Sequence, residues 1–138
     1  MTFGDITLLN VDCMAHMATV PDKFYELAIV DPPYGWISHD RPAKVFDYPY
    51  YGNIEGTTKA ETRIHPTMKP VALYKWLLKN YAKEGDKILD THVGSGSSRI
   101  ACHKAGFDFV GYELDREYWE AQEKRYREFC SQTVMEFK

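Results

Sequence analysis

The chain lacks the sequence features of several common protein classes. None of its apolar runs approaches membrane-spanning length, and its first residues show no basic-then-apolar leader pattern. Its three cysteines, Cys13, Cys102 and Cys130, are far apart and form no Cys-x-x-Cys pair, so we expect free thiols in a cytoplasmic protein. Its five histidines show no metal-ligand spacing either. We therefore predict neither a bound metal nor a membrane partner.

The chain also lacks an excess of positive charge. Its formal net charge is −3, whereas a large DNA-binding surface normally needs a basic stripe that displaces counterions. A length of 138 residues, with 44% hydrophobic and 27% charged residues, is ordinary for one soluble domain. Any nucleic-acid contact must therefore be inferred from specific motifs rather than from bulk charge.

Strand-like and helix-like segments alternate along the chain. Short apolar runs predict strands at residues 6–11, 25–30, 87–90 and 109–113. Helical spacing predicts a short helix capped by Asp12, helices over 70–83 and 97–104, and a final helix capped by Asp115. This order implies an α/β fold whose mostly parallel sheet has right-handed crossovers. Residues 35–64 are typical of an irregular insertion, in which 44–48 hint at a strand.

A stiff tetrapeptide follows the second predicted strand directly. It consists of Asp31, Pro32, Pro33 and Tyr34. Residues after a parallel strand lie at the carboxyl edge of the sheet, where open α/β folds bind ligands. The prolines remove backbone donors, so Asp31 offers an acceptor and Tyr34 a stacking face, both suited to the exocyclic amine of a flat base. The alternative is an ordinary Asp-Pro turn at the end of a strand.

A glycine-containing loop joins the third predicted strand to the next helix. Residues 90–96 read Asp-Thr-His-Val-Gly-Ser-Gly, and Glu113 ends the following strand 19 positions after Gly94 (113 − 94). Glycines in such a loop let a ligand approach the backbone. An acidic residue at the end of the next strand can accept hydrogen bonds from both ribose hydroxyls. The pattern favours a nucleoside-binding unit, and the alternative is a plain tight turn.

The same loop lacks two features of phosphate-binding loops. Arg99 occupies the position of a third glycine, which disfavours the pyrophosphate of NAD or FAD, and no Gly-Lys-Ser/Thr sequence is present. A nucleoside without phosphates fits better, with Asp90 near a cationic group. S-adenosylmethionine has the required ribose and ammonium group. It is therefore the expected cofactor, and an oxidoreductase with a nucleotide cofactor is disfavoured.

Taken together, these motifs resemble those of the DNA methyltransferases that modify adenine N6 or cytosine N4. The similarity is closest to bacterial and phage members, including restriction-modification enzymes, whose catalytic motif precedes the cofactor motif. The tetrapeptide at 31–34 matches their catalytic motif, and the loop at 90–98 matches their cofactor loop. The segment at 65–70 looks like the one that opens their cofactor-side helix, and residues 111–113 are similar to their ribose-binding strand end. The resemblance covers residues 1–35 and 62–129.

The resemblance implies a Rossmann-like methyltransferase fold with a reduced sheet, and a particular set of site residues. It implies the catalytic residues Asp31, Pro32, Pro33 and Tyr34. It implies the cofactor-binding residues Asp12, His65, Thr67, Lys69, Asp90, Thr91, Gly94, Ser95, Gly96, Ser97 and Glu113. The implied reaction transfers a methyl group from S-adenosylmethionine to the exocyclic amine of a base in DNA. The leading Asp of the tetrapeptide favours adenine N6 over cytosine N4.

The chain departs from the family pattern in two ways. Thr91 and His92 replace the usual Pro and Phe of the cofactor loop. The single domain, residues 1–138, also has a short insertion (35–64) between its catalytic-motif half (1–34) and its cofactor-binding half (65–138), where the family carries further strands and the target-recognition region. An alternative function is therefore a non-catalytic remnant that binds cofactor or partners. A reduced sheet would also leave a strand edge that a second copy could cover, which predicts a homodimer.

Overall fold

The computed structural model describes residues 4–30 and 68–135, which contain one parallel sheet. Its four strands are β1 (Ile6–Leu9), β2 (Leu27–Ile29), β3 (Lys87–Asp90) and β4 (Asp108–Tyr112). Their order across the sheet is β1-β4-β3-β2, with every pair parallel. The predicted α/β class with a parallel sheet is confirmed. The predicted insertion at 35–64, with its strand-like stretch at 44–48, lies outside the described residues.

Two strands are shorter than the sequence predicts. β1 ends at Leu9 rather than at residue 11, since the Asn10 side chain turns to the β4 end and donates to the carbonyls of Glu113 and Leu114 (2.8 and 3.1 Å). β2 begins at Leu27 rather than at residue 25, shortly after Lys23, which has a positive φ of 60°. Both strands are therefore shorter than the apolar runs that predicted them, because the backbone leaves the sheet near the ends of these runs.

Four helices connect and cover the strands: α1 (Cys13–Met17), α2 (Val71–Tyr81), α3 (Ser97–Ala105) and α4 (Arg116–Met135). Asp12 caps α1 by accepting from the Ala15 N–H, and Asp115 caps α4 by accepting from the N–H groups of residues 117 and 118. α3 ends at Gly106, whose φ of 78° is the left-handed conformation of a glycine C-cap. Pro70 is the N-cap of α2 rather than its first residue, and α2 ends two residues before the predicted position 83.

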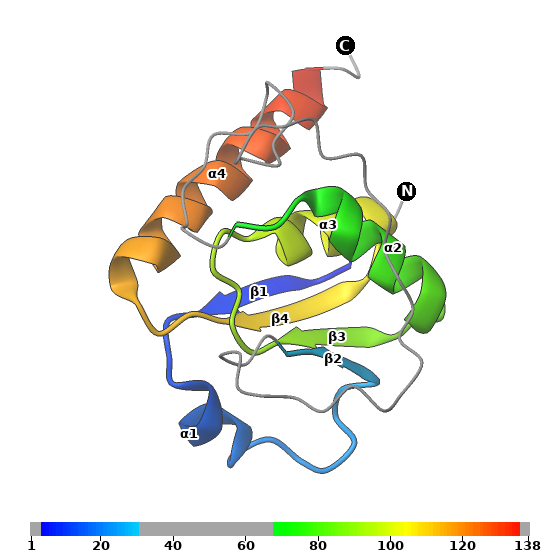
Figure 1. Ribbon diagram of the computed structural model, residues 1–138, viewed down its shortest axis with the longest axis vertical. Helices are drawn as coiled ribbons and strands as arrows, with labels where there is room; N and C mark the ends of the chain where they lie inside the picture. The colour runs from blue at the N-terminus through cyan, green and yellow to red at the C-terminus, as the bar shows by residue number, and fades with distance from the viewer. Residues whose placement is uncertain (1–3, 31–67, 136–138) are drawn as a thin grey trace, which may run out of the picture.

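The main apolar core lies on one side of the sheet. Figure 1 shows α2, α3 and α4 on that side and α1 on the other. The core includes Tyr74 and Leu78 of α2, Ile100 of α3, and Ile88 and Phe109 of the two central strands. Tyr126 and Phe129 of α4 pack against it. The two central strands are therefore covered on one face of the sheet by three helices.

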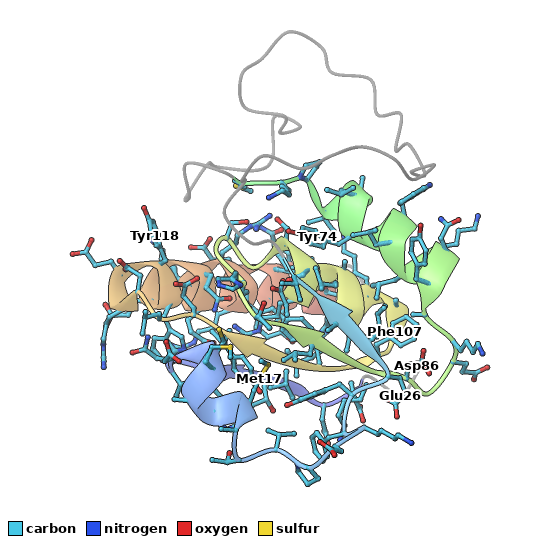
Figure 2. All side chains as sticks on the ribbon, turned by 60° about the horizontal axis from the view of Figure 1, so that its bottom comes forward. Met17, Glu26, Tyr74, Asp86, Phe107 and Tyr118 are labelled. Carbon is cyan, nitrogen blue, oxygen red and sulfur yellow. The ribbon has the colours of Figure 1, made fainter. Side chains whose placement is uncertain are left out.

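The other side of the sheet carries a small polar arrangement under α1. In Figure 2, Met17 of α1 lies on the opposite side of the sheet from Tyr74 of α2. The buried Tyr112 hydroxyl lies 3.0 Å from His16 Nδ1 and 3.1 Å from the Tyr25 hydroxyl. These contacts attach α1 and the segment before β2 to the end of β4. Among the described residues, no helix is long and apolar enough to span a bilayer.

Candidate functional site at the carboxyl edge of the sheet

The parallel arrangement brings the predicted site segments to one edge of the sheet. Asp12 follows β1, Asp90 ends β3, and Glu113 follows β4 directly. Because all four strands run in the same direction, their carboxyl ends meet at this edge. Three carboxylates that are up to 101 positions apart in sequence (113 − 12) thus come from segments that meet at one edge of the sheet.

The strand that leads to the predicted catalytic tetrapeptide lies beside the cofactor loop. β2 pairs with β3 in the register Ile29 opposite Asp90, and the Thr91 N–H donates to the Ile29 carbonyl at 3.3 Å. Asp31, Pro32, Pro33 and Tyr34 themselves lie outside the described residues, as do His65 and Thr67. The expected adjacency of the two strands is confirmed, whereas the roles of these six residues stay predictions.

The cofactor loop has a tight backbone that its glycines allow. Gly94 and Gly96 have φ values of 55° and 81°, which side-chain-bearing residues rarely adopt. At Gly96 a Cβ would also lie 2.8 Å from Gln122 Oε1 of α4. The Gly96 N–H donates to the Val93 carbonyl at 3.1 Å, and Gly96 is the N-cap of α3. The loop therefore packs directly against α4.

Asp90 organises this loop from within. Its side chain is 1% exposed. One carboxylate oxygen accepts from the His92 N–H at 2.9 Å and the other from the Ser98 hydroxyl at 2.5 Å. A buried carboxylate with these partners holds the loop and the first turn of α3 together. It also places a carboxylate at the carboxyl end of β3, inside the loop.

The neighbouring loop residues are mostly buried and hydrogen-bonded to each other. Thr91 Oγ1 lies 2.8 Å from His92 Nδ1, and Ser95 Oγ lies 3.2 Å from Ser97 Oγ. Thr91, Ser95 and Ser97 are no more than 6% exposed. His92 is exposed at the surface of the loop. The hydroxyls at these positions therefore contribute first to the shape of the loop.

Glu113 is a half-buried carboxylate of the predicted site that lies at the end of β4. Its Oε2 accepts from the Gly94 N–H at 2.9 Å, and its Oε1 accepts from the Asp115 N–H at 3.0 Å. The residue is half-buried, and each oxygen of an ionised carboxylate has a second lone pair that can accept another hydrogen bond. Glu113 thus links the cofactor loop to the start of α4 while keeping capacity to accept two further hydrogen bonds.

The last two described site residues, Asp12 and Lys69, lie at the N-termini of helices α1 and α2. Asp12 is exposed and caps α1, so its described contact is structural. Lys69 lies directly before Pro70, the N-cap of α2, and is half-buried.

Burial sets the chemistry of the thiol beneath the site. Burial raises the pKa of the Cys102 thiol well above its usual range, and the nearby negative charge of Asp90 raises it further. Cys102, Cys13 and Cys130 are all free cysteines. Cys102 is therefore a protonated thiol that fills the core under the loop rather than a nucleophile.

Several residues that shape the edge were missed by sequence reasoning. Asn10 ties the Asp12 segment to the Glu113 segment, Ser98 holds Asp90, and Gln122 and Arg125 of α4 contact the cofactor loop. A signal existed for Gln122, because a polar residue at i+3 from Trp119 and i−4 from Tyr126 interrupts the apolar stripe of α4.

A surface hollow elsewhere on the molecule does not coincide with this edge. It measures about 570 Å³ and is lined by α4 residues that include Trp119, Glu123, Lys124 and Arg127. None of the predicted site residues lines it. The gathered carboxylates and the cofactor loop define the candidate site better than the hollow does, because they supply polar groups at the strand ends where open α/β folds bind ligands.

The sequence match to a family model identifies the class of the protein. The model for the DNA methylase family of N6 and N4 methyltransferases matches residues 37–124, which is more than half of the chain. The chain therefore belongs to this DNA methylase family. The match begins after the tetrapeptide at 31–34, so it covers the cofactor loop and Glu113 but not the predicted catalytic motif.

Curated relatives match a shorter part of the chain. The type II methyltransferase M2.DpnII of Streptococcus pneumoniae is 39% identical over 61 residues, which cover 44% of this chain and 23% of the relative. The type II methyltransferase M.HpaI of Haemophilus parainfluenzae is 38% identical over 61 residues, covering 44% of this chain and 19% of the relative. The chain thus spans about a fifth of the length of the curated relatives it matches.

Solved structures give a partial match as well. The complex of M1.HpyAVI with S-adenosylmethionine is 31% identical, with a TM-score of 0.47 over 51% of this chain and 34% of that chain. A crystal structure of M1.HpyAVI is 30% identical, with a TM-score of 0.41 over 44% of this chain and 30% of that chain.

Proposed function

We propose that this chain binds S-adenosylmethionine at the carboxyl edge of its sheet and transfers the methyl group to the exocyclic amine of a base in DNA. We propose adenine N6 as the acceptor, because the catalytic tetrapeptide begins with Asp31 rather than with the Ser more common in cytosine-N4 enzymes. Membership of the DNA methylase family supports DNA as the substrate.

One observation carries the proposal: the pairing of β2 with β3. Ile29 lies opposite Asp90, so the tetrapeptide follows a strand that ends beside the cofactor loop. A base-binding motif and a methyl-donor site must lie within the reach of one transferred carbon. Adjacent carboxyl ends, about 5 Å apart in a sheet, meet this requirement, whereas opposite edges would not.

The described residues fit the proposed cofactor. Glu113 has capacity for two further donors, which matches two ribose hydroxyls. Asp90 supplies a buried negative charge beside the loop, which suits an ammonium or sulfonium group. Gly94 and Gly96 allow the tight backbone of the loop, and the absence of a side chain at Gly96 lets the loop pack against Gln122 of α4.

The proposed chemistry relies on positioning and electrostatics. When bound, S-adenosylmethionine supplies a methyl group activated by its sulfonium. Tyr34 stacks on a base extruded from the duplex, while Asp31 and the Pro32 carbonyl accept hydrogen bonds from its amine. These bonds reduce conjugation of the nitrogen lone pair with the ring. A cofactor bound there would supply the methyl group to this nitrogen and keep its sulfur as a neutral thioether, and Asp31 would accept the proton that the amine gives up.

The alternative is a non-catalytic remnant that binds the cofactor without methylating DNA. The observation in its favour is the short insertion at 35–64, where the resembled family carries further strands and its target-recognition region. The net charge of −3 points in the same direction, because it disfavours a broad DNA surface.

A paired measurement of binding and methyl transfer tests the proposal. Calorimetric titration with S-adenosylmethionine reports the cofactor site, and radiolabelled methyl transfer to mixed unmethylated DNA reports catalysis. We expect Asp31→Ala to retain most cofactor affinity and to lose nearly all methyl transfer, because Asp31 contacts the base. Asp22→Ala, an exposed position before β2, is the matched control and should retain both activities.

The possible results separate the two readings. Cofactor binding by the parent chain without methyl transfer to any DNA would favour the remnant. Methylation by Asp31→Ala at the rate of an active parent would remove Asp31 from the catalytic assignment. The identity of the methylated base, read by nucleoside chromatography, tests adenine N6 against cytosine N4.

A further inference from the structure

An arginine on the last helix, α4, donates hydrogen bonds to the cofactor loop. Arg125 of α4 donates from Nη1 to the Ser95 carbonyl at 2.8 Å and to Ser97 Oγ at 3.0 Å. Arg125 lies 30 positions from Ser95 in sequence, so this contact exists only in the folded chain. A charged donor that joins a loop carbonyl to the first residue of α3 restricts how the loop can move.

The same face of α4 supports the loop at a second point. The side chain of Gln122, which is 1% exposed, packs directly under Gly96. A Cβ at Gly96 would lie only 2.8 Å from Gln122 Oε1, so the loop and the helix are in close contact there. Gln122 and Arg125 are three positions apart and therefore lie on neighbouring parts of one helix face.

This face of α4 is itself anchored to α3. Arg99 is buried and pairs with Glu123 at 2.6 Å, and its guanidinium lies 3.7 Å from the centre of the Tyr126 ring. Arg99, which occupies the position of the third glycine in phosphate-binding loops, therefore points toward α4. These contacts fix the helix that presents Arg125, so the position of Arg125 is determined by the fold.

The order of the strands indicates which part of the cofactor this loop would meet. Glu113, the proposed ribose partner, follows β4, and the tetrapeptide follows β2. The cofactor loop follows β3, which lies between these two strands. The methyl-bearing sulfur has to lie between the ribose and the target base, so the methionine half of the cofactor is the part that lies over β3 and its loop.

We infer that Arg125 is a positioning residue that holds residues 95–97 in the conformation that receives the methionine half of S-adenosylmethionine. This inference rests on the proposed cofactor. Arg125 acts through the Ser95 carbonyl and the Ser97 hydroxyl rather than by touching the reacting atoms. Its loss should loosen the loop, and should weaken ligands that contain the amino acid more than ligands that lack it.

The test compares three full-length variants with the parent chain. Arg125→Gln removes the charged donor, Arg125→Lys retains the charge and can restore one contact, and Arg127→Gln is the matched control. Arg127 lies on the same helix, its side chain is 80% exposed, and its ion pair with Glu123 is long at 3.8 Å. Calorimetry measures the affinity for S-adenosylmethionine and for 5′-methylthioadenosine, which has the nucleoside and the sulfur but no amino acid. Amide hydrogen exchange measures the opening of residues 93–98.

We expect Arg125→Gln to bind S-adenosylmethionine about tenfold more weakly, to bind 5′-methylthioadenosine almost unchanged, and to exchange faster at residues 93–98. Arg125→Lys should recover part of both effects, and Arg127→Gln should match the parent. Equal loss for both ligands would overturn the assignment to the methionine half. Unchanged exchange in Arg125→Gln would overturn the positioning role. A parent chain that binds neither ligand would overturn the proposed cofactor, and the exchange measurement would still decide the contact between Arg125 and the loop.

Discussion

The two parts of the sheet differ sharply in burial. In the N-terminal unit, residues 4–30, no residue is buried, although the unit supplies β1 and β2. In the C-terminal unit, residues 68–135, nearly every position from 88 to 102 is buried. β1 and β2 are the outer strands, and β3 and β4 are the central ones. The difference follows from position, because a central strand is covered by neighbours on both sides and an edge strand is not.

This contrast separates the scaffold from the parts attached to it. The C-terminal unit contains the core, the cofactor loop and Glu113. The N-terminal unit is attached by strand pairing, by Asn10 at the Glu113 and Leu114 carbonyls, and by the contacts of His16 and Tyr25 with Tyr112. On the proposed function, cofactor binding should therefore depend mainly on the C-terminal unit, and methyl transfer should also depend on the N-terminal unit, whose β2 precedes the tetrapeptide.

The largest expected effect is on folding, and it tests the contrast in burial directly. Phe109 of β4 is fully buried and lies opposite the half-buried Ile6 of β1 in the sheet register. Phe109→Ala should lower the free energy of unfolding by about 3–5 kcal/mol, because it opens a cavity in the core. Ile6→Ala should cost roughly 1–2 kcal/mol, because less of its side chain leaves water. Urea denaturation measures both, and equal costs would contradict the proposed division into scaffold and attachment.

An intermediate effect is expected on cofactor affinity. Glu113→Ala removes the proposed charged acceptor for two ribose hydroxyls and should cost roughly 1.5–3 kcal/mol, which is about tenfold or more in affinity. Asp12→Asn keeps the helix cap and removes the charge in the N-terminal unit, so its effect on calorimetric affinity for S-adenosylmethionine should be smaller. A greater loss in Asp12→Asn would show that the N-terminal unit contributes more to cofactor binding than the structure indicates.

The smallest expected effect is a pH dependence of stability in the C-terminal unit. Burial, and then the positive charge of Arg99, lower the pKa of His103 below its ordinary 6.5. The unfolded chain therefore takes up a proton at a higher pH than the folded chain, and the stability that neutral His103 contributes is present above pH 6.5. This contribution is lost as the pH falls through the folded pKa.

The difference in the free energy of unfolding between the parent chain and His103→Gln isolates this pH dependence. The free energy of unfolding of the parent should fall relative to that of His103→Gln as the pH is lowered from 7.5 to about 5. A difference that stays constant over this range would rule out the lowered pKa. His103 packs edge-on against Tyr126 and Phe129, with Nδ1 2.6 Å from the Tyr126 hydroxyl, so the measurement also reports the packing of α3 against α4.

The sequence determined the elements and their chemistry where the signals are local. Asp12 and Asp115 as helix caps, Gly106 as a helix stop and the short apolar runs as strands all act through neighbours along the chain, so their patterns are readable without a fold. The adjacency of β2 and β3 was also predictable, since the two motifs had to serve one site.

Only the tertiary structure decided which side chains support the site from a distance. The position of β1 beside β4, the turn of Asn10 to the Glu113 carbonyl and the reach of Arg125 to Ser95 join residues between 30 and 103 positions apart. A hydrogen bond depends on tenths of an ångström and on direction, and neither is set by residue type or spacing along the chain. The motif residues are therefore readable from the sequence, whereas the contacts that hold them in place arise from how the helices pack on the sheet.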